Sequence, residues 1–305
     1  MAYNKQNFKD GDVLTADNLI NLENGIITST PYGGLAGKTV SFLADSITTW
    51  SDPDGTRWIP DGYKCWYGNG SATGQEGGNT HAASRIDNIN KTWWKQVLNA
   101  LGMKLCVNAA WSGSRVTGNS TDKSGSVGCG DGRINALTVK SGVKSECPIG
   151  TTPDIIIVFI GINDFGLSNI APGNWDFKSL PAEGSQATFD VAYATCIKKI
   201  MTTYPNAEVF CCTLLETTSR YDKSSGWPTN NNNCTLKDYN DKIRAIAQLF
   251  GTNIIDLHAC GLTYFNCSSN CMDNIHPNVN GAKLMARKAV ADICAQSRYG
   301  VKSLQ

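Results

Sequence analysis

The stretch Ile155–Asp164, with the sequence IIIVFIGIND, decides the fold class of this chain. Its first part, Ile155–Ile160, is a short apolar run rich in β-branched residues that ends at a glycine. Such a run predicts a strand buried on both faces, as found in parallel sheets covered by helices. The polar residues Asn163 and Asp164 follow directly, at the strand end where open α/β sheets bind their ligands.

Similar apolar runs on either side of this stretch predict the rest of a sheet. The strand candidates are Thr39–Ala44, Lys104–Val107, Glu208–Leu214 and Asn253–Leu257. Helix candidates with glycine or proline stop signals lie between them, at Ile89–Leu101, Phe189–Tyr204, Leu236–Phe250 and about 280–296. This alternation predicts a parallel five-stranded sheet in a three-layer α/β/α sandwich. The long Gly-, Ser- and Asn-rich segments 62–79 and 113–147 are expected to form rims or lids.

Composition limits the classes of function that need considering. The chain has 305 residues, 41% hydrophobic and 17% charged, which predicts one sizeable globular domain with a small appendage. A formal net charge of +1 gives no electrostatic reason to expect nucleic acid or an anionic membrane as partner. No apolar run approaches the roughly 20 residues of a membrane span. The twelve cysteines are not arranged as a small disulfide scaffold, and pairing of Cys129 with Cys147 or of Cys267 with Cys271 stays open.

Residues that suit acyl-transfer chemistry follow the predicted strands at one edge of the sheet. Ser46 comes after the first strand and His276 lies beyond the last. A serine hydroxyl becomes a nucleophile when a base removes its proton, and imidazole titrates near neutrality. Asp273, one helical turn before His276, is expected to fix the tautomer of the imidazole and to stabilise the imidazolium. The backbone N–H of Ser46, at the start of an expected helix, would favour a developing negative charge.

These motifs, in this order, resemble the blocks of the SGNH (GDSL-like) hydrolases from Lys38 to Gln296. Residues 44–46 resemble the G-D-S block, residues 161–164 match G-x-N-D, and residues 273–277 match D-x-x-H-P. The resemblance implies a flavodoxin-like sheet and an oxyanion hole formed by Ser46, Gly113 and Asn163. It gives Asp45, Gly161 and Asp164 supporting places in the motifs. The chain departs from the family at Ala44, where glycine is usual, and in a looser second block around Gly113.

Several residues have simpler interpretations. Asp45 or Ser46 would also suit a helix cap, and Asn163 with Asp164 a turn. A cluster of Cys267, Cys271, Asp273 and His276 would suit zinc, although only one such cysteine pair occurs. Four tryptophans near the expected cleft suit either stacking on sugar rings or packing in the core: Trp50, Trp58, Trp66 and Trp111.

The first 36 residues are interpreted as a separate attachment or oligomerisation segment, with the hydrolase domain at 37–305. Residues 8–26 resemble the short leader of phage tail-fibre and baseplate proteins of Gram-positive hosts, and they predict an amphipathic helix that needs a partner surface. A plain helix packed on its own domain is the alternative. Residues 1–12 lack the layout of a signal peptide, so we expect synthesis in the cytoplasm and, for a virion protein, extracellular action after lysis.

The sequence therefore predicts a serine ester hydrolase that needs no metal or organic cofactor. Its expected substrate is a short acyl ester, above all O-acetyl groups on a cell-surface polysaccharide, because no long apolar stretch suits a fatty acyl chain. Its expected partners are this acylated glycan or a small ester, phage tail or baseplate proteins, and further copies of the chain. The alternative is a virion adhesin that binds glycan on an inactive SGNH fold, which Ala44 and the loose second block would favour.

Overall fold

The computed structural model describes residue 15 and residues 34–52, 54, 56, 58–59, 65–68, 86–117, 149–150, 152–166, 170–179, 187–216 and 229–300. The expected leader helix, most of both long loops, His81, Cys129 and Cys147 lie outside these residues. Among the described helices, none has the length and apolar character needed to cross a membrane.

A five-stranded parallel sheet in the described part of the chain confirms the predicted fold class. Its strands are arranged in the order β2-β1-β3-β4-β5. Their bounds are β1 Thr39–Ala44, β2 Lys104–Ala110, β3 Ile155–Phe159, β4 Glu208–Cys212 and β5 Asn253–Ile255. Each pairing is parallel.

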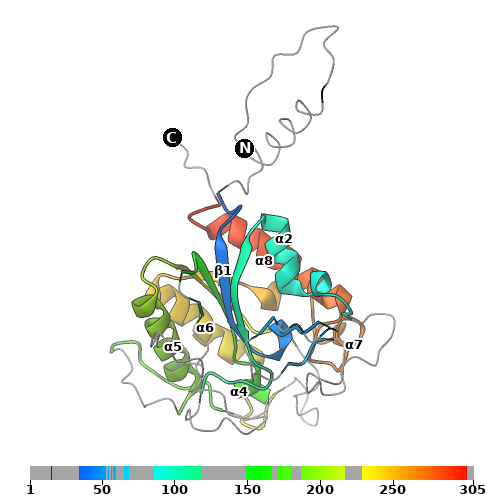
Figure 1. The fold of residues 1–305 in the computed structure, drawn as a ribbon. Helices are drawn as coiled ribbons and strands as arrows, with labels where there is room; N and C mark the ends of the chain where they lie inside the picture. The colour runs from blue at the N-terminus through cyan, green and yellow to red at the C-terminus, as the bar shows by residue number, and fades with distance from the viewer. Residues whose placement is uncertain are drawn as a thin grey trace.

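Helices cover both faces of this sheet and make it the middle layer of three. The helix α2 (Trp93–Leu101) packs against α8 (Val279–Gln296) on one side, and α5 (Phe189–Thr203) packs against α6 (Leu236–Phe250) on the other (Figure 1). The shorter helices are α4 (Ile162–Gly166), α7 (Cys267–Asn270) and the 3₁₀ turns η1 (Ser46–Thr48), η3 (Ile89–Lys91) and η4 (Leu257–Ala259).

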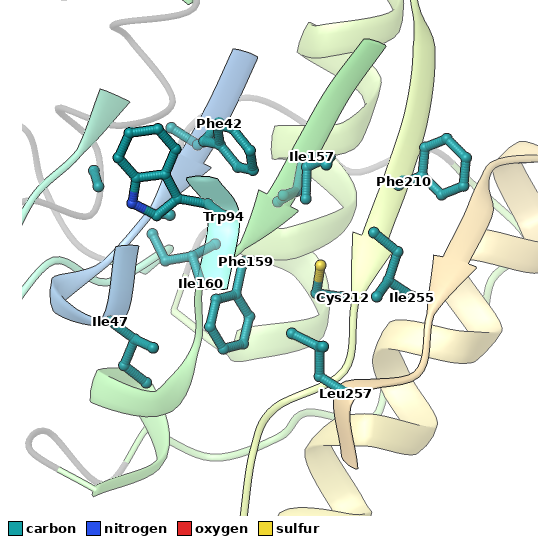
Figure 2. Close-up of a cluster of buried hydrophobic side chains, with 14 of the residues drawn as sticks. Phe42, Ile47, Trp94, Ile157, Phe159, Ile160, Phe210, Cys212, Ile255 and Leu257 are labelled. Atoms are coloured by element: carbon teal, nitrogen blue, oxygen red, sulfur yellow. The ribbon is translucent and has the colours of Figure 1, made fainter. Parts of the chain in front are cut away.

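The hydrophobic core lies on both faces of the central strand β3, whose residues are all buried. Figure 2 shows Phe42, Trp94 and Ile157 in the cluster of side chains around it. The ring of Trp93 packs edge-on against Phe42 and Phe159, at centroid distances of 5.8 and 5.7 Å. This burial of apolar area on two faces is the main stabilising contribution to the sheet, at about 25 cal/mol per Å².

The largest departure from the predicted elements is at β2, which continues to Ala110 and does not end at Val107. The polar Asn108 looked like a strand end, but its side chain is satisfied inside the fold. Its amide donates to the Thr48 carbonyl at 2.8 Å, and its Oδ1 accepts from the Ala110 N–H at 3.2 Å. A buried polar group with partners does not end a strand.

Smaller departures concern the ends of other elements. The predicted helix 89–101 divides into η3 and α2, because Thr92 has an extended backbone and caps α2 by accepting from the Lys95 N–H. The strands β3, β4 and β5 end one or two residues before the predicted positions. By contrast, α6 has the predicted bounds, from a capping box at Thr235 and Asp238 to Gly251 at φ 66°.

The register of the sheet positions the functional residues. Ala44 at the end of β1 pairs with Ala110 of β2 and with Phe159 of β3. The three strand ends are therefore level, and the segments that follow them begin at one edge of the sheet.

Candidate active site

Ser46 lies at the start of η1, directly after β1. The side chain of the preceding Asp45 accepts a hydrogen bond from the Ile47 N–H at 3.0 Å, and the Thr49 hydroxyl donates to the Ser46 carbonyl at 2.8 Å. Ser46 is 4% exposed. We expected a helix dipole here, but η1 has only three residues. The turn is thus fixed by side-chain bonds, and the Ser46 N–H can act as a single donor without a substantial macrodipole.

His276 lies in the loop between α7 and α8, which closes on itself. The Met272 N–H donates to the His276 carbonyl at 2.8 Å. The backbones of Cys271 and Pro277 also pair in a single antiparallel β-bridge. The Asp273 Oδ1 atom accepts from the backbone N–H groups of Ile275 and His276, at 3.1 and 2.8 Å. The loop therefore fixes the backbone of the acid and of the histidine together.

The side chains of Ser46, His276 and Asp273 meet, as expected from the sequence. His276 Nε2 lies 2.7 Å from Ser46 Oγ, and His276 Nδ1 lies 2.7 Å from Asp273 Oδ2. Burial of Asp273 disfavours its charge, but the hydrogen bond and charge of His276 outweigh this and lower the pKa of the carboxyl below its usual value. An ionised Asp273 accepts a hydrogen bond from the Nδ1–H group, so the proton stays on Nδ1 and the lone pair of Nε2 faces the hydroxyl of Ser46.

The segment after β2 brings Gly113 to the same edge of the sheet. The Trp111 N–H donates to the Ala44 carbonyl at 3.0 Å, and the Ser114 hydroxyl donates to the same carbonyl at 3.3 Å. Gly113 has φ 81°, a conformation that a side chain would strain. The looser second block therefore forms a turn attached to the strand that precedes Ser46.

Asn163 and Asp164 hold this segment from the other side, in the first turn of α4. Asn163 Nδ2 donates to the Ser114 carbonyl at 2.8 Å, which uses one of the two N–H donors of the amide. Asp164 accepts from the Val116 N–H, and from the N–H and hydroxyl of Thr117. Burial raises the pKa of Asp164 to about 6, although the hydrogen bonds from Thr117 and Val116 act to lower it. Asp164 therefore does not only form a turn after β3, because it also binds the backbone of the segment that follows β2.

Two motif positions have clear steric explanations. Gly161 has φ 134°, and a Cβ there would lie 2.8 Å from the ring of Phe189, so glycine is required. Ala44 ends β1 in regular pairing and is absent from the residues with positive φ. The departure from glycine at Ala44 therefore causes no backbone strain in the turn that carries Ser46.

The four tryptophans are explained by packing more than by an open platform. Trp50 and Trp66 are buried, and Trp58 and Trp111 are partly buried against the core. The indole N–H groups of Trp50 and Trp58 both donate to Asp52, at 2.7 and 2.6 Å. Trp66 stacks on the ring of His276, a contact that sequence reasoning missed because no local pattern links residues so far apart.

The zinc arrangement is not what the geometry favours. Cys267 Sγ and Cys271 Sγ lie 3.5 Å apart, but both ring nitrogens of His276 are at hydrogen-bond distance from Asp273 and Ser46 oxygens. Within the described residues, no group of histidine, cysteine and acidic side chains has the geometry of a metal site.

The fold and the site together define a class, the three-layer α/β proteins with a serine, a histidine and an aspartate joined at the carboxyl edge of a parallel sheet. Residues 38–284 match the model of the GDSL-like lipase/acylhydrolase family. The chain belongs to this family of ester hydrolases.

Solved structures support the same fold. A candidate GDSL-like lipase from Bacteroides ovatus is 18% identical with a TM-score of 0.57, over 86% of this chain and 100% of that one. A second, from Bacteroides uniformis, is 21% identical with a TM-score of 0.54, over 85% and 97%. An active-site mutant of a family two carbohydrate esterase from Clostridium thermocellum is 15% identical with a TM-score of 0.50, over 85% and 64%. No curated protein matches the chain.

Proposed function

We propose that this chain is a serine ester hydrolase in which Ser46 is the nucleophile and His276 its general base. The observation that carries the proposal is the pair of 2.7 Å contacts that join the hydroxyl of Ser46, the imidazole of His276 and the carboxylate of Asp273. A hydroxyl bonded to a base that is itself oriented by an acid is the arrangement that acyl transfer requires.

The reaction follows from these contacts. Ser46 Oγ attacks the carbonyl carbon of the ester while His276 Nε2 takes the hydroxyl proton. The tetrahedral intermediate collapses, the proton passes from His276 to the departing alcohol, and an acyl-enzyme remains on Ser46. Water then gives a proton to His276 and attacks the acyl carbon, and collapse of this second intermediate releases the acid and returns the proton to Ser46. None of these steps requires a metal or an organic cofactor.

The oxyanion of each intermediate would be bound by the backbone N–H groups of Ser46 and Gly113 and by the side-chain amide of Asn163. All three groups belong to segments that start at the same level of the sheet, and Asn163 is bonded to the turn that contains Gly113. Each donor of this kind typically lowers the barrier by about 3–4 kcal/mol.

The substrate we propose is a short acyl ester, above all an O-acetyl group on a cell-surface polysaccharide. Ser46 and His276 are only 4% and 6% exposed, which suits a small acyl group at the point of attack. The carbohydrate esterase among the solved structures gives a precedent for this fold acting on glycans. The phage-like residues 8–26 would supply attachment to a tail or baseplate, self-association and extracellular action on host glycan.

Hydrolysis of p-nitrophenyl acetate by the purified chain tests the proposal. We expect turnover that falls by about 10⁴-fold or more in Ser46→Ala, because the nucleophile is lost. Ser41→Ala is the matched control, since Ser41 is a buried serine of β1, the strand that precedes Ser46, and its hydroxyl donates to the Ile149 carbonyl away from the site. Preference for octanoyl over acetyl esters would contradict the short-acyl proposal.

The adhesin alternative predicts a folded chain without turnover. Its two supports were Ala44 and the loose second block, and neither disturbs the arrangement around Ser46. No specific observation favours it over the esterase.

A further inference from the structure

Trp66 and Tyr67 pack against the imidazole of His276 outside the hydrogen-bonded triad. The indole of Trp66 stacks on the imidazole at 3.6 Å between ring centroids, with 12° between the planes. The ring of Tyr67 approaches the same imidazole at 6.0 Å and 83°. Hydrogen bonds to Asp273 and Ser46 fix the two nitrogens in the plane of the ring, whereas Trp66 covers one face of it. Trp66 is itself 5% exposed.

The backbone that carries this indole is bound to the turn of Ser46. The Thr49 hydroxyl oxygen accepts from the N–H groups of Trp66 and Tyr67, at 2.9 and 3.3 Å, and the same hydroxyl donates to the Ser46 carbonyl. One side chain therefore sets the position of Trp66 relative to the nucleophile.

The same short segment is also bound to the histidine loop. The Tyr67 hydroxyl donates to the Pro277 carbonyl at 2.8 Å, and burial raises the pKa of Tyr67 well above its usual range, so the phenol keeps its proton. The next residue, Gly68, pairs with Ser51 in a single parallel β-bridge of the backbone. A Cβ at Gly68 would lie 2.6 Å from the Ser51 carbonyl oxygen. Residues 65–68 thus connect the two halves of the proposed site.

We propose that Trp66 is a positioning residue for His276, which holds the plane of the imidazole throughout the catalytic cycle. The inference rests on the proposed function, because a base needs a fixed orientation only if it transfers protons. In the acyl-enzyme, Ser46 Oγ has become an ester oxygen and no longer donates to Nε2. Of the contacts described above, the bond to Asp273, the stack on Trp66 and the edge contact of Tyr67 then remain to orient the imidazole toward water, and the stack covers a whole face of the ring. The indole face also stabilises the imidazolium that forms in each half of the reaction.

The kinetic test compares Trp66→Leu with Trp66→Phe on p-nitrophenyl acetate. Trp66→Leu removes the flat ring, and we expect kcat to fall by about 10–100-fold with KM within a factor of about two, since misplacement of a catalytic group affects the chemical step. Trp66→Phe restores a flat ring, and kcat should recover to within about threefold of the wild type. Equal losses in the two variants would overturn the inference.

A matched control separates positioning from loss of a buried indole. Trp94 is buried and packs against Phe42 and Trp58. Trp94→Leu, or Trp94→Phe if the leucine variant does not fold, should lower the unfolding temperature while kcat of the folded protein changes less than in Trp66→Leu. A kcat loss as large as that of Trp66→Leu would contradict a specific role for Trp66.

A second readout does not depend on catalysis. The chain has three histidines, so the imidazole C–H protons can be assigned by NMR in a Ser46→Ala background with a His276→Gln reference. Stacking should shift the His276 protons upfield through the ring current of Trp66, and Trp66→Leu should remove this shift. If the His276 signals are the same with and without Trp66→Leu in this background, Trp66 is not a positioning residue. A wild type that shows this shift but hydrolyses no ester would instead refute the proposed function.

Discussion

The imidazole of His276 is the residue on which the other functional groups depend. It contacts Ser46 and Asp273 through its two nitrogens and Trp66 through its face. Such a ring is useful as a base only in one tautomer and one orientation. The tautomer depends on Asp273, whose side chain is partly buried and 39% exposed. It remains a carboxylate because the hydrogen bond and charge of His276 lower its pKa by more than burial raises it.

Replacement of this carboxylate should leave the fold in place and remove most of the activity. In Asp273→Asn the amide can donate to Nδ1, which favours the tautomer with its proton on Nε2, and we expect kcat to fall by about 10⁴-fold. Asp241→Asn on the exposed side of α6 is the control for a lost surface charge. Steady-state kinetics and thermal unfolding of both variants provide the measurement, and a kcat near that of the wild type would exclude the assigned role of Asp273.

Asn163 should contribute through charge stabilisation in the transition state. Removal of its amide in Asn163→Ala should lower kcat by about 10²–10³-fold with little change in KM, the effect typical of one oxyanion donor. The variant also loses the bond to the Ser114 carbonyl, so its unfolding temperature must be compared with that of the wild type. An active but less stable variant would indicate that Asn163 only holds the turn.

The helix α4 is a short element whose first turn fastens the segment after β2. Asp164 makes three hydrogen bonds to Val116 and Thr117, and it is fully buried. Its raised pKa of about 6 means that the folded state binds a proton more readily than the unfolded chain, whose carboxyl titrates near 3.8. Protonation of Asp164 therefore adds to the unfolding free energy. This contribution is complete below about pH 3.8 and is lost as the pH rises through about 6.

This linkage predicts a change in the pH dependence of stability. In Asp164→Asn, the fall in unfolding free energy that Asp164 causes between about pH 3.8 and 6, on the order of 3 kcal/mol, should be absent. Urea unfolding of both proteins at a series of pH values measures the difference. The contribution of Asp273 has the opposite sign, because its lowered pKa adds stability above the unfolded value that is lost on acidification. Identical pH profiles for the two proteins would mean that Asp164 titrates normally.

The junction between β3 and α4 should tolerate no side chain at Gly161. In Gly161→Ala, the Cβ would contact the Phe189 ring in a backbone region that alanine rarely adopts, and we expect a loss of about 2–3 kcal/mol in unfolding free energy. Gly251→Ala is a suitable comparison, because Gly251 also has positive φ but a Cβ there meets nothing within 4 Å. Gly251→Ala should cost about 1 kcal/mol, and an equal loss in both variants would exclude the collision as the cause.

For the molecule as a whole, the described fold begins with residues just before β1. Leu35 is buried, and the Gly37 N–H donates to the Gly102 carbonyl at 2.8 Å. A chain that lacks residues 1–33 should therefore keep its unfolding temperature and its kcat/KM within about twofold, since the five strands and the residues of the proposed site all lie within residues 34–300. Light scattering of the full and shortened chains tests the proposed attachment segment, which predicts a larger assembly for the full chain alone.

Local patterns were enough to predict the five strands, the main helices and the residues of the proposed triad. Buried strands and amphipathic helices have short periods, and motifs such as Asp273–Pro277 lie within one turn of chain, so both are visible in a single sequence. The predicted ends were less accurate where a buried polar side chain such as Asn108 continues a strand.

Long-range contacts could not be predicted from these patterns. The level ends of β1, β2 and β3 depend on register, and the stack of Trp66 on His276 depends on a loop without periodicity whose anchor reaches Pro277 from 210 residues away. The bonds of Asp164 to Thr117 likewise join segments that only the folded sheet brings together. Neighbouring residues along a chain fix their own conformation, but the partners of a side chain are set by the packing of the whole sheet, which no short stretch of sequence contains.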